Sequence, residues 1–186
     1  MRDSIGIAAS LICRDDFEGF KAASYLCPAD YWTIGYGNRF IAPNRPVTPQ
    51  TRPLTRAAAL DLLRRTLVQL RADLVSCVHV SLAPQQEGAL LSWQFNIGNT
   101  AMRNSTLIRV LNLGQLEAAG RELLRWDKAT VRGKLITLPG LKKRRQIEYA
   151  VFNGQSPPDQ PDLFTCNQSA RLTSATPSCD RIGTAV

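Results

Sequence analysis

The feature that most constrains the fold is a stripe of five leucines in the middle of this 186-residue chain. The stripe advances by 3, 4, 3 and 4 residues, which is the spacing of one face of an α-helix. Its members are Leu60, Leu63, Leu67, Leu70 and Leu74. Thr55 stands where such a helix would begin, so the pattern predicts a long helix over Thr55–Val80 with this face in a core. The stripe is shorter than the three or four heptads that a coiled coil requires.

The segment before this helix has a different character. Residues 20–42 are rich in aromatic and β-branched side chains interleaved with Gly35 and Gly37, which predicts a small, bent hairpin or sheet. We expect a first helix ahead of it, capped by Ser4 and continuing to Gly19. We interpret that helix as amphipathic and not as an export signal, because it lacks a basic leader. Four prolines separate the hairpin from the leucine helix and predict a loop there.

Four shorter helices are predicted after the leucine helix. They begin near Ser81, after Asn104-Ser105, at Leu116 (ending at Trp126) and at Leu141 (ending at Phe152). We expect one domain, over residues 1–154. Residues 155–186 are rich in Pro, Ser and Thr, and we expect an extended or disordered C-terminal tail there, with a Cys166–Cys179 bridge as one interpretation.

The charge is strongly basic and unevenly distributed. The chain has 23 Lys and Arg against 15 Asp and Glu, a net charge of +8. Residues 41–154 carry a net +10, whereas residues 1–40 carry a net −1. A basic excess of this size favours a polyanionic partner, which could be nucleic acid, an anionic lipid surface or an anionic polysaccharide. The apolar content of 44% excludes a disordered chain and a typical membrane protein.

One glutamate stands between the first predicted helix and the hairpin. It is Glu18, and Phe17 and Phe20 flank it. A carboxyl group among apolar side chains keeps its proton to higher pH, which makes it a useful general acid near neutrality. Alone this is a weak signal, because most glutamates near helix ends are solvated.

The residues that follow Glu18 form a far more specific pattern. Cys27 comes nine positions later, and Thr33 six positions beyond it opens the run Thr33-Ile34-Gly35-Tyr36-Gly37. Later motifs are Phe95-Asn96-Ile97-Gly98, Asn104-Ser105-Thr106-Leu107, Arg125-Trp126, Leu138-Pro139-Gly140-Leu141, Arg144-Arg145 and Glu148. In this order and spacing, the set resembles the phage lysozyme (endolysin) family of glycoside hydrolases over roughly residues 4–154.

The resemblance implies a lysozyme-like fold of the α+β class, mainly α, in which a small lobe holds Glu18 and the hairpin and a larger lobe is helical. It also implies hydrolysis of the β-1,4 bond between N-acetylmuramic acid and N-acetylglucosamine in peptidoglycan. The acid glutamate of the family falls on Glu18 and its threonine on Thr33. The second catalytic position, commonly an aspartate, falls on Cys27 in this chain.

Further site residues follow from the same resemblance. Phe95, Asn96 and Ser105 match positions that line the sugar cleft in the family, although helix capping explains Ser105 equally well. Arg144 and Arg145 are both candidates for an ion-pair partner of Glu18. Such a cation would favour the ionised form of the carboxyl group and oppose the effect of apolar neighbours.

The cysteine puts the usual mechanism in question. Glycoside hydrolysis normally uses two carboxyl groups, one to protonate the leaving oxygen and one to activate water or attack the sugar. A free thiol, with a pKa near ~8.5, is mostly neutral at pH 7, so Cys27 is not the steady anion that an aspartate provides. We expect Glu18 to protonate the leaving group while Thr33 and Cys27 position and partly activate water. The alternative is that Cys27 is a buried, inert thiol.

Other functions remain open on the sequence alone. A lytic transglycosylase would use Glu18 without an activated water, which suits the loss of the second carboxylate. A non-catalytic nucleic-acid binder or a membrane-active protein is favoured only by the charge. We expect no nucleic-acid partner and no cofactor, and no metal site because the single His79 and five cysteines lack ligand spacing. We expect a monomer that is made in the host cytoplasm, since no export signal is recognised, and that acts on the cell wall in the periplasm or outside. The family implies that a holin releases it.

Overall fold

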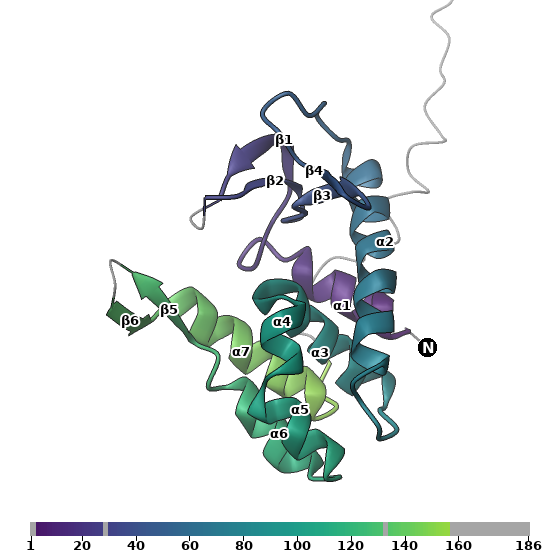
Figure 1. Ribbon diagram of the computed structural model, residues 1–186, viewed down its shortest axis with the longest axis vertical. Coiled ribbons are helices and arrows are strands. Elements are labelled where there is room, and N and C mark those ends of the chain that lie inside the picture. The colour runs from purple at the N-terminus through teal and green to yellow at the C-terminus, as the bar shows by residue number, and fades with distance from the viewer. Residues whose placement is uncertain (1–2, 28–29, 132–133, 157–186) are drawn as a thin grey trace, which may run out of the picture.

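The computed structural model describes residues 3–27, 30–131 and 134–156 (Figure 1). Within these ranges the chain forms seven helices and three two-stranded antiparallel hairpins, so the predicted α+β, mainly α class is confirmed. The expected tail lies outside the described residues beyond Ser156, and so does its Cys166–Cys179 pair. No helix in the described ranges has the length and hydrophobicity that crossing a bilayer requires.

The first part of the chain forms one short helix and two hairpins. Helix α1 spans Ser4–Ile12, strands β1 and β2 span Lys21–Leu26 and Trp32–Gly35, and strands β3 and β4 span Phe40–Ala42 and Arg45–Pro46. β1 pairs with β2, and β3 pairs with β4. The predicted hairpin over residues 20–42 is therefore present, and a second, shorter hairpin follows directly from it.

The leucine stripe forms helix α2 (Arg56–Val75), which ends five residues before the predicted boundary. Thr55 caps it, because its Oγ1 accepts a hydrogen bond from the Ala58 amide at 3.2 Å. α2 contributes to two separate cores. Leu63 and other members of the stripe enter the main core, whereas their neighbour Leu62 packs with Ile34 and others in a small cluster under the hairpins.

The rest of the chain is mostly helical. The elements are α3 (Pro84–Ile97), α4 (Asn99–Arg103), α5 (Thr106–Asn112), α6 (Leu116–Leu123), β5 (Lys128–Val131), β6 (Lys134–Thr137) and α7 (Pro139–Phe152). α4 and the β5–β6 hairpin were not predicted, and α6 ends three residues before Trp126. α3 begins at Pro84 and not near Ser81, because a proline is favoured in the first helical turn, where no partner for its nitrogen is needed.

Helix α1 differs most from its prediction. Asp3, not Ser4, caps it, because the Asp3 Oδ1 accepts a hydrogen bond from the Gly6 amide at 2.6 Å. The helix ends at Ile12 and not near Gly19, which adopts a left-handed φ of +61° inside a series of turns. Seven of its nine residues are buried, so the amphipathic interpretation was wrong: α1 is enclosed by α2 and α3.

The two hairpins β1–β2 and β3–β4 lie at one end of the molecule and the later helices at the other, with the β5–β6 hairpin beside α7. Figure 1 shows β1–β4 at one end, α3–α7 at the other and α2 running alongside both. The segment 13–20, which contains Glu18, connects α1 to the β1–β2 hairpin and so lies where the two parts meet.

Candidate active site

Glu18 occupies a turn between α1 and β1. The Arg14 carbonyl accepts hydrogen bonds from the amides of Phe17 and Gly19, which folds the segment back on itself. The Glu18 side chain is 21% exposed, so part of it is open to solvent although most of it is covered. A residue in this position can exchange a proton with a bound substrate or with water.

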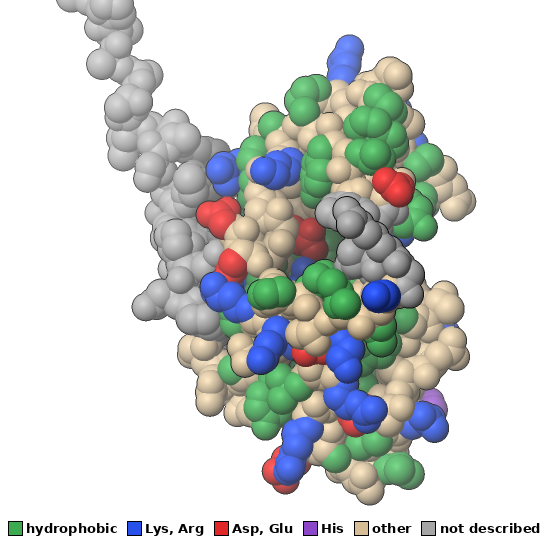
Figure 2. Space-filling model, turned by 90° about the vertical axis from the view of Figure 1, so that its left-hand side faces the viewer, with side chains coloured by type: hydrophobic (Ala, Val, Ile, Leu, Met, Phe, Trp, Pro, Cys, Tyr) green, Lys and Arg blue, Asp and Glu red, His purple; other side chains and the backbone are tan. Residues whose placement is uncertain are grey.

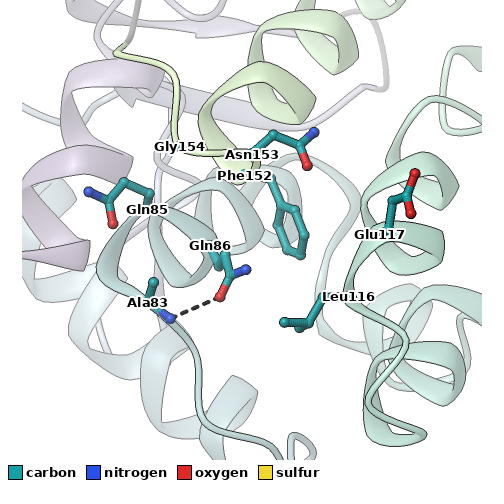
Figure 3. Close-up of a pocket in the computed structure, with 8 residues that line it drawn as sticks. All are labelled: Ala83, Gln85, Gln86, Leu116, Glu117, Phe152, Asn153 and Gly154. Carbon is teal, nitrogen blue, oxygen red and sulfur yellow. Dashed lines mark hydrogen bonds between the residues drawn. The ribbon is translucent and has the colours of Figure 1, made fainter.

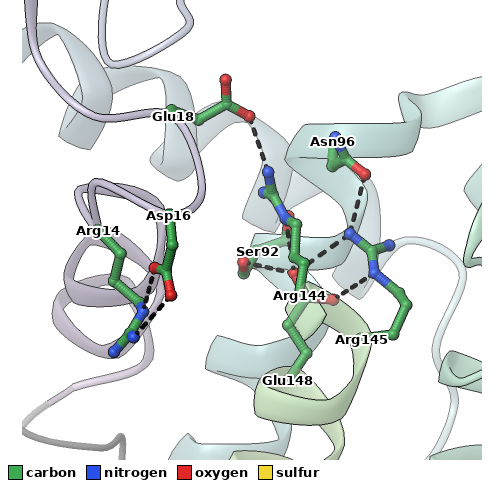
Figure 4. Close-up of polar contacts among 8 residues, drawn as sticks. All are labelled: Arg14, Asp16, Glu18, Ser92, Asn96, Arg144, Arg145 and Glu148. Carbon is green, nitrogen blue, oxygen red and sulfur yellow. Dashed lines mark hydrogen bonds and ion pairs between the residues drawn. The ribbon is translucent and has the colours of Figure 1, made fainter. Parts of the chain in front are cut away.

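Arg144 of α7 is the ion-pair partner of Glu18. Its Nη1 donates to Glu18 Oε1 at 2.8 Å, and only 4% of the Arg144 side chain is exposed (Figure 4). Of the two arginines that the sequence offered as partners, the structure brings Arg144 to Glu18. Arg145 points elsewhere and donates from Nη2 to Asn96 Oδ1 at 2.8 Å.

A buried carboxylate, Glu148, lies behind both arginines. Its Oε1 is 3.1 Å from Arg144 Nε, and its Oε2 is 3.0 Å from Arg145 Nε. Ser92 of α3 donates its hydroxyl to the same carboxylate at 2.7 Å. Burial lowers the pKa of Arg145 to about 10, while the negative charge of Glu148 acts in the opposite direction. Arg145 therefore remains a cation at neutral pH.

A second contact ties the same turn to α7. Asp16 lies 3.0 Å from Lys143 Nζ and accepts hydrogen bonds from Arg14. Hydrogen bonding to Arg14 is the main reason that the pKa of Asp16 is held at about 2. Two consecutive residues of α7 thus hold two carboxylates of the turn.

Gly37 closes the opposite side of the Glu18 carboxylate. Its φ is +84°, and a Cβ placed on it would lie 2.7 Å from Glu18 Oε2 and 3.0 Å from its Cδ. Both facts favour glycine at this position. The carboxylate is therefore held between the Arg144 guanidinium on one side and the Gly37 backbone on the other.

Thr33 and Cys27 belong to the β1–β2 hairpin. Thr33 pairs with Tyr25 in the ladder and donates its hydroxyl to the Tyr25 carbonyl at 3.3 Å. The ladder continues past the last strand residue, because the Cys27 amide donates to the Tyr31 carbonyl at 2.9 Å. Alternate positions of a strand share a face, so this register places Cys27 and Thr33 on the same side of the hairpin. Thr33 is buried, Cys27 is half-buried, and the Cys27 thiol is not in a disulfide.

The three residues predicted to line the sugar cleft have different environments. Phe95 borders a groove of about 620 Å³ between the β3–β4 hairpin, α2 and the α3–α4 junction. Asn96 is exposed, and its carbonyl oxygen is occupied by Arg145. Ser105 is buried and caps α5 by accepting a hydrogen bond from the Ile108 amide at 3.1 Å. Gly37 also borders the groove, so the groove reaches the backbone that packs on Glu18.

A second pocket, of about 410 Å³, is formed by α3, α6 and the end of α7 (Figure 3). Glutamines, Glu117 and the Phe152 ring line it, and Gln86 is already hydrogen-bonded to the Ala83 amide. Glu117 is the one ionisable residue of this lining, and it is ion-paired with Arg121 of the same helix. Among the described residues, no group of three His, Cys, Asp or Glu side chains is arranged to hold a metal ion.

Sequence reasoning missed two parts of this site. Glu148 was noted as part of a motif but given no role, and Ser92 was not singled out. The clue for Glu148 was its spacing, because residues three and four apart on a helix are neighbours and Glu148 follows both arginines at these intervals. Ser92 offered no signal, since its partner is 56 positions away in the sequence.

Comparison with known proteins gives consistent matches. A sequence model of the phage lysozyme family matches residues 15–148. An endolysin of Acyrthosiphon pisum secondary endosymbiont phage 1 is 40% identical over 142 residues, covering 76% of this chain and 93% of that protein. An endolysin of Bacillus phage PZA is 34% identical over 143 residues, but the match covers 52% of that protein. The structure of an endolysin from Escherichia coli O157:H7 phage FAHEc1 superimposes with a TM-score of 0.72 at 28% identity, covering 86% of this chain and 96% of that one.

Proposed function

The chain belongs to the phage lysozyme family and is a glycoside hydrolase that lyses peptidoglycan, and we propose that Glu18 is its general acid. The observation that carries this assignment is the way the carboxylate is held. Arg144 contacts it at 2.8 Å, the Gly37 backbone packs on it, and 21% of the side chain stays open to solvent. A carboxyl group fixed on two sides and open on a third suits proton transfer to a bound glycan.

In the proposed reaction, protonated Glu18 delivers its proton to the oxygen that links N-acetylmuramic acid to N-acetylglucosamine. The bond from this oxygen to the muramic acid C1 then breaks, and positive charge develops on the sugar ring. Proton transfer leaves Glu18 as a carboxylate. The Arg144 guanidinium, already in contact, stabilises that product charge without moving.

Water completes the reaction, and we assign its placement to Thr33 and Cys27. The Thr33 hydroxyl donates to the Tyr25 carbonyl, which leaves its oxygen lone pairs free to accept a hydrogen bond from water. Cys27 lies on the same face of the hairpin, where its thiol can take a second contact. Two substitutions test the role of Cys27. If Cys27→Ala leaves turnover unchanged, the thiol has no role in the reaction. Higher turnover in Cys27→Asp would support position 27 as the place where a second catalytic carboxylate acts.

The groove beside Phe95 is the proposed glycan site. Its volume of about 620 Å³ is in the range of small-molecule sites, and it extends from Gly37 along the β3–β4 hairpin. Asn96 retains its amide N–H groups for sugar oxygens while Arg145 occupies its carbonyl. Ser105 remains a proposed contact of the glycan. Its Oγ accepts a hydrogen bond from the Ile108 amide, which supports its interpretation as a helix cap.

The basic charge suits recruitment to an anionic cell envelope. On the face shown in Figure 2, Lys and Arg side chains outnumber Asp and Glu over the helical part. Lys128, Lys134 and Lys142, in the segment from β5 to α7, are all exposed. Added salt should therefore weaken binding to whole walls more than it slows turnover of a short neutral glycan.

The biological setting follows the same family. We propose that the protein is a monomer made in the host cytoplasm, that a holin releases it, and that it then acts on the wall. The division into a catalytic domain over residues 1–154 and a tail over 155–186 is part of this proposal. Removing the tail after Ser156 and measuring lysis of purified walls and of intact cells would test it: unchanged values for both would mean that the tail has no role in lysis.

The central experiment is loss of turbidity of purified peptidoglycan by wild type and Glu18→Gln. Loss of a general acid should lower the rate by about 10²- to 10⁴-fold. Glu117→Gln is a matched control, because Glu117 is 78% exposed on α6, and it should retain the wild-type rate. Equal rates for wild type and Glu18→Gln would refute the assignment. New reducing ends in the products identify a hydrolase, and anhydro-muramic ends would identify a transglycosylase.

A further inference from the structure

Glu148 is an ionised group with no access to solvent. Its side chain is 0% exposed, and the side chains that compensate its charge are Arg144 and Arg145 of the same helix, with a hydrogen bond from Ser92 of α3. Burying a carboxylate is unfavourable unless it is paired and hydrogen-bonded. The reaction proposed above makes no direct use of Glu148, so its presence requires another explanation.

The two arginines that Glu148 holds point in different directions (Figure 4). Arg144 extends to Glu18 at 2.8 Å and also donates to the Ser92 carbonyl at 3.1 Å. Arg145 extends to Asn96 at 2.8 Å. One buried carboxylate thus contacts the Nε atoms of two guanidinium groups. The Nη atoms of these groups contact Glu18, the proposed acid, and Asn96, a proposed sugar ligand.

This inference rests on the roles proposed above for Glu18 and Asn96. We propose that Glu148 is a positioning residue: it holds Arg144 and Arg145, and these two side chains fix the positions of the Glu18 and Asn96 side chains. The four charged groups, Glu18, Glu148, Arg144 and Arg145, balance to zero. Without the negative charge of Glu148, Glu18 is the remaining carboxylate of the cluster beside two guanidinium groups, of which Arg144 contacts it directly. Their field then favours the Glu18 anion, which is the wrong protonation state for a general acid.

The other charged groups around this turn do not change in such a variant. They are Arg14, Asp15 and Asp16 on the turn itself, Lys143 of α7, and Arg56 of α2, which stacks on Phe20. The neighbours contributed by β2–β3 and α3, Gly37 and Ser92, are uncharged. A shift in the pH profile would therefore report the loss of the Glu148 charge.

The test compares Glu148→Gln with wild type in kcat, KM and the pH dependence of activity on purified peptidoglycan. We expect kcat to fall about 10- to 100-fold, as a small misplacement of catalytic groups produces. We expect the pH above which activity declines to move down. We expect KM to rise about 3- to 10-fold through Asn96. In Glu148→Gln/Asn96→Ala, KM should equal that of Asn96→Ala alone, because Glu148 acts on KM through Asn96.

The matched control is Val151→Ala, which opens a cavity at a fully buried position on the same helix and removes no charge and no hydrogen bond from the cluster. Its melting temperature should fall while kcat, KM and the pH profile stay at their wild-type values. If Val151→Ala reproduces the changes seen in Glu148→Gln, or if folded Glu148→Gln matches wild type in all three measurements, the positioning role is refuted. Rescue by Glu148→Asp, which restores the charge, should recover part of kcat.

Should Glu148→Gln fail to fold, Ser92→Ala removes one hydrogen bond to Glu148 and keeps both ion pairs. It should shift kcat and the pH profile in the same direction by a smaller factor, and wild-type values would overturn the proposal. Glu18→Gln is measured in parallel. If Glu18→Gln is active, the assignment of the acid fails; if it is inactive while Glu148→Gln behaves as wild type, only the role of Glu148 fails.

Discussion

Substitution of Gly37 by alanine should separate the position of Glu18 from the stability of the fold. The new Cβ would lie 2.7 Å from Glu18 Oε2, whereas uncrowded contacts of this kind begin near 3.4 Å. The carboxylate must therefore move by roughly 0.7 Å, and displacements approaching 1 Å can cost about 10²-fold in rate. We expect a loss of turnover of about 10- to 100-fold.

The same substitution also strains the backbone. Gly37 has a φ of +84°, and an L-residue in this region costs about 1–2 kcal/mol. For a domain of this size, each kcal/mol lowers the melting temperature by roughly 2–4 °C, so we expect a decrease of about 2–8 °C. The measurements are loss of turbidity of purified peptidoglycan and thermal unfolding followed by circular dichroism.

Gly114 provides the matched control. Its φ of +76° imposes a similar strain, but a Cβ there meets no atom within 4 Å. Gly114→Ala should lose a similar amount of stability and retain wild-type turnover. If Gly37→Ala also retains turnover, or if both variants lose it equally, then close packing on the Glu18 carboxylate does not set the activity.

Three further changes test the packing and the charges. Gly88→Ala should destabilise the fold by about 1–3 kcal/mol, because its Cβ would lie 2.6 Å from Ile7 Cγ2 where α3 crosses α1. The pKa of Asp16 is held at about 2, so its contribution to stability is present above about pH 4 and is lost as the pH falls toward 2; Asp16→Asn should flatten this decline in acid denaturation curves. Burial raises the pKa of Cys13 from about 9 to about 12, so stability should fall as pH rises through this interval, and less so in Cys13→Ala.

The packing prediction for Gly88→Ala has a control in the same chain. Gly140→Ala lies in helix α7 with open space around the new Cβ, and it should be neutral or stabilising by up to about 1 kcal/mol. Equal destabilisation by Gly88→Ala and Gly140→Ala would contradict the packing argument. If acid denaturation is unchanged in Asp16→Asn, then Asp16 does not determine the loss of stability at low pH. If alkaline denaturation is unchanged in Cys13→Ala, then Cys13 does not determine the loss of stability at high pH.

Local patterns were sufficient for most of the fold. The leucine stripe defined α2, because a helix repeats every 3.6 residues whatever surrounds it. Aromatic residues and glycines defined the β1–β2 hairpin, and Ser105 was correctly predicted as a helix cap. The β5–β6 hairpin was missed because its strands are four residues each, too short for a periodic signal.

The order of the motifs identified the family, and the sequence alone placed Glu18, Cys27 and Thr33 as candidates. It could not decide between Arg144 and Arg145 as the partner of Glu18. Both lie in one run of basic residues, and only the orientation of α7 against α3 determines which guanidinium group reaches Glu18.

The tertiary structure alone revealed the charged cluster behind the site. Glu148 and Ser92 are 56 residues apart, and Arg144 and Glu18 are 126 apart, so no local pattern connects them. Hydrogen bonds and ion pairs act over about 3 Å, whereas periodicity reports only which face of an element is apolar. The sequence therefore determined the elements and the candidate acid, while the packing of α7 determined what holds that acid in place.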